Sequence, residues 1–235
     1  MFNWAVTNEL LAAKPRYGSM FDKPTASQKQ KEKNLRELEH GERMFTADQV
    51  KQLLAATDGQ MKAMILLGVN CGFGNSDCGT LPLKALDLDG GWVNYHRPKT
   101  GITRRCALWP ETVAALRVVI AERKEPKNPA NAELAFITYK NESWHKPDDR
   151  NPISAEMRKL LNALSIEGKR NFYAMRHTFE TIGGESRDQV AVDHIMGHAR
   201  DDMASVYRER ISDERLKAVA EHVRKWVFSE LTASK

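Results

Sequence analysis

The feature that most constrains the fold is a nearly continuous apolar run from Met61 to Val69, in which Lys62 is the one charged residue. A helix that is apolar around most of its circumference has to be buried on all sides. Cys71-Gly72 follows the run, and a glycine at this place can end a helix in the left-handed conformation. We therefore expect a helix that lies inside the domain and ends at Gly72.

Another helix is expected to begin a short distance before this run. Thr46 is placed to act as its N-cap, and Gln49, three residues later, completes the capping-box pattern. The apolar residues that follow at helical spacing should face the core: Val50, Leu53 and Leu54.

The rest of the pattern predicts a small sheet and several further helices. Residues 86–108 alternate around two turns, as in a small antiparallel sheet. Pro110 and Ser154 are each placed to open a helix, and Leu134 to Tyr139 is predicted as a short strand. The last helix should present one apolar stripe to the core: Leu216, Val219, Ala220, Val223 and Val227. The expected fold class is α+β, mostly helical with one small antiparallel sheet.

Three regions are expected along the 235 residues. Residues 1–21 contain a short mixed apolar stretch that is compatible with a brief helix ending before Pro15. Residues 22–43 are rich in Lys, Glu and Gln, which predicts either a solvated linker or a loose surface helix. Residues 44–235 are expected to form the main domain, since a chain of 235 residues with ordinary apolar content has room for one sizeable α+β domain plus an arm.

Composition narrows the class of protein. The net charge of +5 and the pI near 9.1 favour an anionic partner, although only weakly. Three cysteines without a Cys-x-x-Cys pair argue against a disulfide framework or a zinc ribbon, so Cys71, Cys78 and Cys106 are expected to be free core thiols. The first residues lack a signal-peptide pattern, and no segment is apolar enough to span a membrane. We expect a cytoplasmic protein.

Polar residues that suit phosphate chemistry follow one another near the C-terminal end: Arg176-His177, then His198 after Met196-Gly197, then Tyr207. Arginine suits two phosphate oxygens at once, and a histidine can donate to a third or move a proton. A phenol, with an ordinary pKa of about 10, needs such surroundings before it can attack a phosphate. Taken alone, Gly197 is an ordinary helix C-cap and Tyr207 an ordinary half-buried aromatic. Together, the residues are typical of a phosphodiester-cleaving site.

These residues resemble the catalytic domain of the tyrosine recombinases, or phage integrases. The family's His-x-x-Arg-His box falls on Tyr173 to His177, its Leu-Gly-His box on Met196 to His198, and its nucleophile on Tyr207. The family also has a basic β-hairpin with a lysine at its turn. Arg97 to Arg105 is similar to that hairpin and puts Lys99 at the lysine position. The resemblance implies the fold of the recombinase catalytic domain.

The first box departs from the family pattern. Members carry an arginine in Thr-Gly-Leu-Arg-x-x-Glu, whereas the matching stretch from Cys71 to Asp77 has Gly74 at the arginine position. In the second box, Tyr173 replaces the first histidine. Removing one preorganised donor to a developing anion typically slows a reaction about 10²–10³-fold. The nearby cations in the sequence that could compensate are Arg97, Arg104 and Arg105.

The resemblance implies site-specific recombination or integration of DNA, without an external cofactor or metal, through a 3′-phosphotyrosyl link formed by Tyr207. Arg176 would bind the non-bridging oxygens, His198 would donate to one of them, and Lys99 would protonate the leaving 5′-oxygen. Supporting roles are implied for Tyr173, His177 and Asp77. DNA contacts are further expected from a set of basic residues: Arg97, Lys99, Arg104, Arg105, Lys169, Arg170 and Arg176.

Two other functions stay open at this point. Gly74 and Tyr173 favour a non-catalytic DNA-binding module with an accessory or regulatory role, and a hydrolytic relative would let water resolve the tyrosyl link. Double-stranded DNA is the expected partner in each case. Family members assemble on DNA and often pass the C-terminal helix to a neighbour, so the stripe at 216–227 could pack in cis or in trans. Residues 1–21 would then be the remnant of an N-terminal, arm-like core-binding domain.

Overall fold

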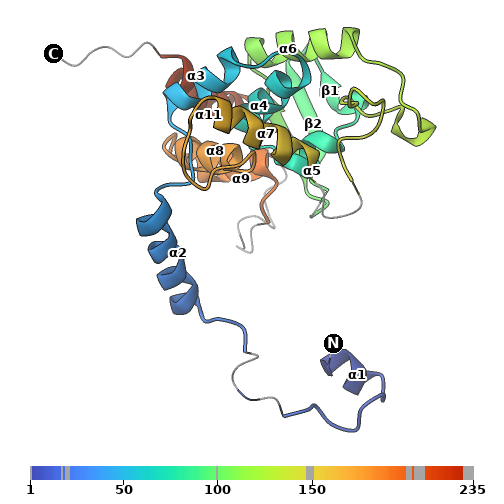
Figure 1. The fold of residues 1–235 in the computed structure, drawn as a ribbon, viewed down its shortest axis with the longest axis vertical. Helices are drawn as coiled ribbons and strands as arrows, with labels where there is room; N and C mark the ends of the chain where they lie inside the picture. Colours follow the sequence, from blue (N-terminus) through green and yellow to red (C-terminus); the bar gives the residue numbers. More distant parts are fainter. Residues whose placement is uncertain are drawn as a thin grey trace, which may run out of the picture. The chain divides into compact units, whose positions relative to one another are not determined.

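The computed structural model describes residues 2–16, 18, 22–98, 100–146, 151–199, 203 and 210–229. The chain divides into two compact units, Met1–Gly41 and Glu42–Lys235. The first unit holds α1 (Phe2–Thr7) and α2 (Ala26–His40) (Figure 1). A capping box between Thr25 and Gln28 begins α2, so most of the polar segment 22–43 is helical rather than extended. That the first unit is the remnant of another domain stays a prediction.

The buried centre of the second unit is α4 (Gly59–Cys71), as the apolar run predicts (Figure 1). All of its residues from Ala63 to Cys71 are buried. It contacts α3 (Ala47–Ala55), α6 (Pro110–Ala121), α8 (Ala174–Gly184) and α11 (Asp213–Phe228). The predicted capping box between Thr46 and Gln49 at the start of α3 is confirmed, as is the left-handed stop at Gly72.

The small sheet is antiparallel, with strands in the order β1 (Leu86–Asp87), β2 (Trp92–His96) and β3 (Thr103–Ala107). The register of β2 and β3 places Tyr95 opposite Arg104. Side chains of β3 alternate, so that Arg104 and Cys106 are buried while Thr103 is exposed and Arg105 is partly exposed. The predicted sheet over residues 86–108 is therefore confirmed.

A buried asparagine joins α4 to the sheet and to α6. The side-chain amide of Asn70 donates to the carbonyl of Ala107 at 3.0 Å. Its oxygen accepts from the Trp109 amide at 2.9 Å and from the Thr112 hydroxyl at 3.0 Å. These bonds fix the end of β3 against α4, and thereby the position of the residues that β3 carries.

The shorter helices and turns complete the second unit. They are α5 (Asn75–Gly79), α7 (Pro152–Ala163) and α9 (Gln189–Met196), with 3₁₀ turns at Leu83–Ala85 and Pro129–Asn131. The stripe predicted on α11 is confirmed, because all five of its apolar residues are buried. They pack against α3, α4, α8, α9 and β3 of the same chain, while the predicted self-assembly on DNA through this helix stays a prediction.

Two of the predicted local features are wrong. Leu134 to Tyr139 forms no strand but makes isolated bridges, Pro82 to Leu134 and Ile137 to Ser143, because no described neighbour continues the ladder. Ser154 does not cap α7. The cap is Asn151, whose side chain accepts a hydrogen bond from the Ser154 amide at 3.0 Å, and Pro152 takes the first helical position.

The three cysteines are free and buried, as predicted. Burial raises the pKa of the Cys71 and Cys78 thiols, which keeps both protonated. Within the part of the chain that the structure describes, none of the helices has the length and apolar character that crossing a membrane requires.

Candidate active site

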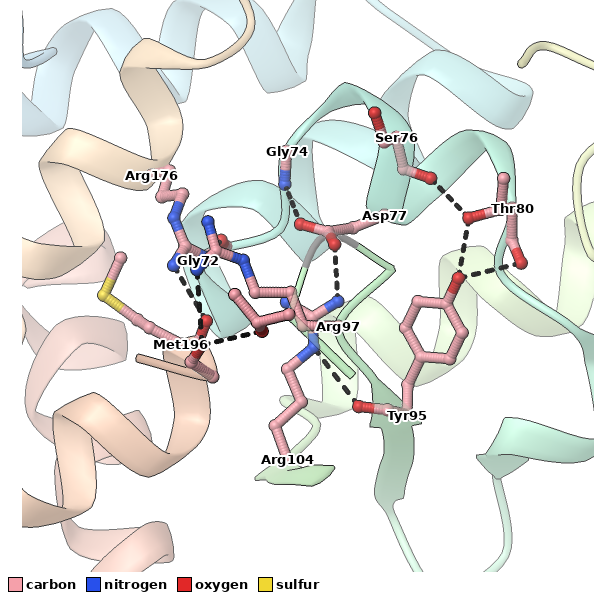
Figure 2. A network of polar contacts seen from close by, with 12 residues as sticks. Gly72, Gly74, Ser76, Asp77, Thr80, Tyr95, Arg97, Arg104, Arg176 and Met196 are labelled. Atoms are coloured by element: carbon pink, nitrogen blue, oxygen red, sulfur yellow. Dashed lines mark hydrogen bonds and ion pairs between the residues drawn. The ribbon is translucent and has the colours of Figure 1, made fainter. Parts of the chain in front are cut away.

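Two helix ends hold the guanidinium of Arg176, which lies on α8 and is 2% exposed. Its Nη1 donates to the carbonyl of Gly72 at 2.6 Å, and its Nη2 donates to the carbonyl of Met196 at 2.8 Å (Figure 2). These carbonyls stand at the C-terminal ends of α4 and α9. Helix C-termini have unpaired carbonyls and a partial negative charge, so the two ends together fix a cation.

The charge of Arg176 has no carboxylate partner among the described residues, and its buried Nε makes no hydrogen bond there. Burial, followed by the charge of Arg97, lowers the pKa of Arg176, although a guanidinium remains charged at any physiological pH. Buried charges are normally paired. An arginine held in this way is suited to receive an anion.

His198 follows α9, and its imidazole contacts the same guanidinium nitrogen of Arg176 that bonds to the Met196 carbonyl. Its Nε2 lies 2.8 Å from Arg176 Nη2, and because a guanidinium only donates, this Nε2 must accept. The ring proton is then on Nδ1, which lies 3.5 Å from Glu180 Oε2 and 3.6 Å from Asp193 Oδ1. Burial, then the charge of Arg176, lowers the pKa of His198 despite these carboxylates. The lowered pKa and the acceptor role of Nε2 both favour the neutral imidazole.

Glu180 and Asp193 are site residues that the sequence analysis missed. Glu180 stands one turn after Arg176 on α8, and this i,i+4 spacing is the signal that could have found it. One ligand atom from each of Glu180, Asp193 and His198 lies within 4.8 Å of the others, so the three could hold a metal ion. Both carboxylates, however, accept from the amide of Gln189, at 2.9 and 3.0 Å. The Gln189 amide thus already supplies a hydrogen-bond donor to each carboxylate.

An arginine from the sheet forms an ion pair with the acidic residue of the first box. Asp77 Oδ2 accepts from the Gly74 amide at 2.7 Å, and Asp77 Oδ1 pairs with Arg104 Nη2 at 2.7 Å (Figure 2). Both side chains of the pair are buried. Of the three arginines that the sequence offers as substitute cations, Arg104 is the one that contacts this segment.

Tyr173 lies beside Gly74. A Cβ atom added to Gly74 would stand 3.3 Å from Cδ2 of the Tyr173 ring. The same ring meets His177 edge-on, with the ring centroids 5.4 Å apart. The residue that replaces the second-box histidine therefore packs against the residue that replaces the first-box arginine.

The basic hairpin from Arg97 to Arg105 contacts the turn that follows α9. Arg97 Nη1 donates to the Gly197 carbonyl at 3.2 Å, and the hydroxyl of Thr100 lies 3.5 Å from the same oxygen. Lys99, which stands between these two residues in sequence, lies outside the described residues, and so does Tyr207. Their predicted roles as proton donor and nucleophile stay predictions.

Three other basic residues predicted to bind DNA lie outside this group. Arg105 faces the opposite side of β3, pairs with Asp213 at 2.8 Å and covers the ring of Trp92. Arg170 donates to the carbonyls of Met44 and Glu167, while Lys169 is exposed. The structure thus brings together Arg97, Arg104, Arg176 and His198.

Comparison of the chain with known proteins identifies one family. Residues 43–214 match the family model described as the phage integrase family. No curated protein is similar to the chain in sequence.

Solved structures of recombinases and integrases are similar to the chain. XerA recombinase is 21% identical, with a TM-score of 0.56 over 77% of this chain and 65% of its own. The integrase of mycobacterium phage Brujita is 18% identical, with a TM-score of 0.54 over 94% and 67%. A lambda integrase dimer bound to a COC′ core site is 14% identical, with a TM-score of 0.58 over 90% and 71%. The chain spans less than two thirds of the XerA chain, and such identities show a shared fold.

Proposed function

The chain belongs to the phage integrase family, and from this premise we propose that it cleaves and rejoins DNA strands through a phosphotyrosyl intermediate. The proposed partner is double-stranded DNA, and the proposed reaction is site-specific recombination or integration. No cofactor is required, because the energy of the cleaved phosphodiester is conserved in the protein–DNA link.

The observation that carries the proposal is the buried cation of Arg176. Two helix C-termini and His198 hold it, and no described carboxylate neutralises it. A purely structural arginine on α8 would be expected to pair with an acid, because burying an unpaired charge is costly. Instead, the positive charge of Arg97 further lowers the pKa of Arg176. The chemistry that such a site fits is a phosphate diester.

In the proposed reaction, the hydroxyl of Tyr207 gives up its proton to water, its oxygen attacks the scissile phosphorus, and the bond to the 5′-oxygen breaks. A 3′-phosphotyrosyl bond forms, and Lys99 gives a proton to the leaving 5′-oxygen. Arg176 neutralises the non-bridging oxygens. In the second half, a 5′-hydroxyl gives its proton to Lys99 and attacks the phosphorus. The bond to the Tyr207 oxygen breaks, the phenolate takes up a proton from water, and the diester is restored.

His198 has to change its bonding for this reaction. In the DNA-free protein, its Nε2 accepts from Arg176 and so cannot donate to a phosphate. A phosphate that binds Arg176 would release Nε2, and its negative charge would raise the pKa of the imidazole. The ring, which has Glu180 and Asp193 beside its Nδ1, could then take a proton and donate it to a phosphate oxygen.

Covalent trapping tests the proposal. The protein is incubated with nicked DNA in which cleavage releases a short strand, so that the adduct cannot be resolved by rejoining. A protein–DNA band that resists denaturation is expected, and it should disappear with Tyr207→Phe. Arg176→Met should remove the band as well while leaving the protein folded, because Met keeps the length of the buried stem.

The rival is a DNA-binding module that has lost strand cleavage, and Gly74 and Tyr173 are the residues that favour it. A protein that binds DNA but forms no adduct on any nicked substrate would establish the rival. An adduct that forms and then disappears without a rejoined strand would instead indicate hydrolysis of the phosphotyrosyl link.

A further inference from the structure

Arg104 is a second buried arginine near Arg176, and its direction is set by the sheet. It is 1% exposed and lies on β3 opposite Tyr95. Because side chains alternate along a strand, Arg104 points inward toward α5, while Arg105 points away toward α11. The anchoring of β3 to α4 through Asn70 keeps this direction fixed.

Three contacts orient the guanidinium of Arg104. Its Nη2 pairs with Asp77 at 2.7 Å, its Nε donates to the Tyr95 carbonyl at 3.3 Å, and its Cζ lies 4.2 Å from the centre of the Phe73 ring. The remaining nitrogen, Nη1, is buried and has no hydrogen-bond partner among the described residues. A buried donor without a partner is unfavourable and calls for an explanation. An anion that binds at this place would provide the partner.

The stem of Arg104 packs on the turn that carries the other site groups. A Cβ atom added to Gly197 would stand 3.4 Å from Arg104 Cδ and 3.1 Å from Arg97 Cβ. The residue before Gly197 gives its carbonyl to Arg176, and the residue after it is His198. Figure 2 shows Arg97, Arg104 and Arg176 approaching one another from separate segments of the chain. Arg104 is thus close enough to Arg176 for its charge to lower the pKa of Arg176.

We infer that Arg104 supplies, from β3, the cation that Gly74 does not supply from the first box, so that Arg104 and Arg176 together bind the scissile phosphate. The inference rests on the proposed function. Asp77 orients Arg104 through Nη2, and Nη1 donates to a non-bridging oxygen. The packing of the Tyr173 ring against Gly74 fits this assignment, because the space beside Gly74 is used by a side chain other than an arginine.

The first experiment exchanges the two positions. Arg104→Met, Gly74→Arg and the double variant are compared with the wild type for the rate of adduct formation on nicked DNA. Arg104→Met should slow trapping about 10²–10³-fold, the cost typical of one lost anion donor. The double variant should regain at least tenfold over Arg104→Met, because the cation returns from the other side. Arg117→Met, at an exposed arginine of α6, is the matched control and should leave the rate unchanged.

The second experiment separates phosphate binding from a structural role. The scissile phosphate is replaced by a methylphosphonate, in which a neutral methyl group stands for one charged oxygen. An arginine that neutralises that oxygen matters less on the neutral substrate, so the defect of Arg104→Met should shrink at least tenfold. A structural arginine would produce the same defect on both substrates. If Arg104→Met does not fold by circular dichroism, Arg104→Lys, which keeps the charge without the fork, gives the same comparison.

The outcomes are separable. An adduct that Arg104→Met forms as fast as the wild type overturns the inference and leaves the proposed function standing. A defect that is equal on phosphate and methylphosphonate, and that Gly74→Arg does not relieve, also overturns it, because Arg104 then only holds β3 to α5. Absence of adduct from the wild type, with no change in Tyr207→Phe, overturns the proposed function and the inference together.

Discussion

Gly72 joins the fold to the proposed site, and its replacement by alanine should damage both. Its backbone is left-handed, with φ 63°, and its carbonyl accepts the 2.6 Å bond from Arg176. A Cβ atom at this position would stand 3.1 Å from Met196 Cγ and 3.1 Å from Phe179 Cδ1. Both neighbours are buried, so neither can move away into solvent.

The expected loss in the free energy of unfolding of Gly72→Ala has two parts, one from the backbone and one from packing. Left-handed backbone costs a residue with a Cβ about 1–2 kcal/mol, of which about 0.4–1 kcal/mol is returned because alanine restricts the unfolded chain. Overpacking of a filled core adds about 1–3 kcal/mol. Gly72→Ala should therefore lower the free energy of unfolding by roughly 1–5 kcal/mol. Gly59→Ala, at the other end of α4, has φ 49° with no atom of the described residues within 4 Å of its added Cβ, and should cost only about 1 kcal/mol.

Urea unfolding followed by circular dichroism measures both values, and the difference between the two variants isolates the overpacking. Adduct formation is then measured well below the unfolding midpoint, where both variants are folded. Gly72→Ala should form adduct more slowly than Gly59→Ala, because displacement of the Gly72 carbonyl shifts the guanidinium of Arg176. Equal stabilities for the two variants would refute the packing argument, and equal adduct rates would refute the link to the site.

Three further predictions follow from the same structure. Asn70→Ala leaves the Trp109 amide, the Thr112 hydroxyl and the Ala107 carbonyl without their partner, and urea unfolding should show a loss of about 2–4 kcal/mol. Because folding lowers the pKa of His198, the unfolded chain binds more protons between the folded pKa and about 6.5. Stability should therefore fall as pH drops through that window, and less steeply in His198→Gln. If phosphate contacts dominate DNA affinity, its logarithm should fall linearly with log[salt], about 0.9 per phosphate contacted; a flat response would contradict DNA binding.

The parts of the fold that local sequence determines were predictable. The apolar run of α4, the capping box of α3 and the stripe of α11 each depend on spacing within one helix, and all three are confirmed. The strand at Leu134 to Tyr139 failed because a strand also needs a neighbour at the correct register. The cap of α7 failed by three residues because Pro152 can occupy the first helical turn, which leaves Asn151 as the better N-cap.

In the site, too, some contacts were predictable from the sequence and others were not. Arg176 and His198 meet because a left-handed turn at Gly197 follows α9 directly, and the sequence spacing already predicted their proximity. The pairing of Arg104 with Asp77 could not be predicted, since it depends on which face of β3 turns inward. Alternation does not decide this for Arg104 and Arg105, because both faces of the strand are covered, one by the site and the other by α11.

This limit bears on how a departure from a family motif should be interpreted. A motif records which segment supplies a charge, whereas a phosphate responds only to where the charge stands. The first box lacks an arginine in its sequence, yet a buried guanidinium contacts its acidic residue at 2.7 Å and has one donor without a partner among the described residues. Gly74 alone is therefore weak evidence for lost cleavage. Whether Arg104→Met behaves differently on charged and neutral phosphates decides the matter, because that difference measures the position of the charge rather than its place in the sequence.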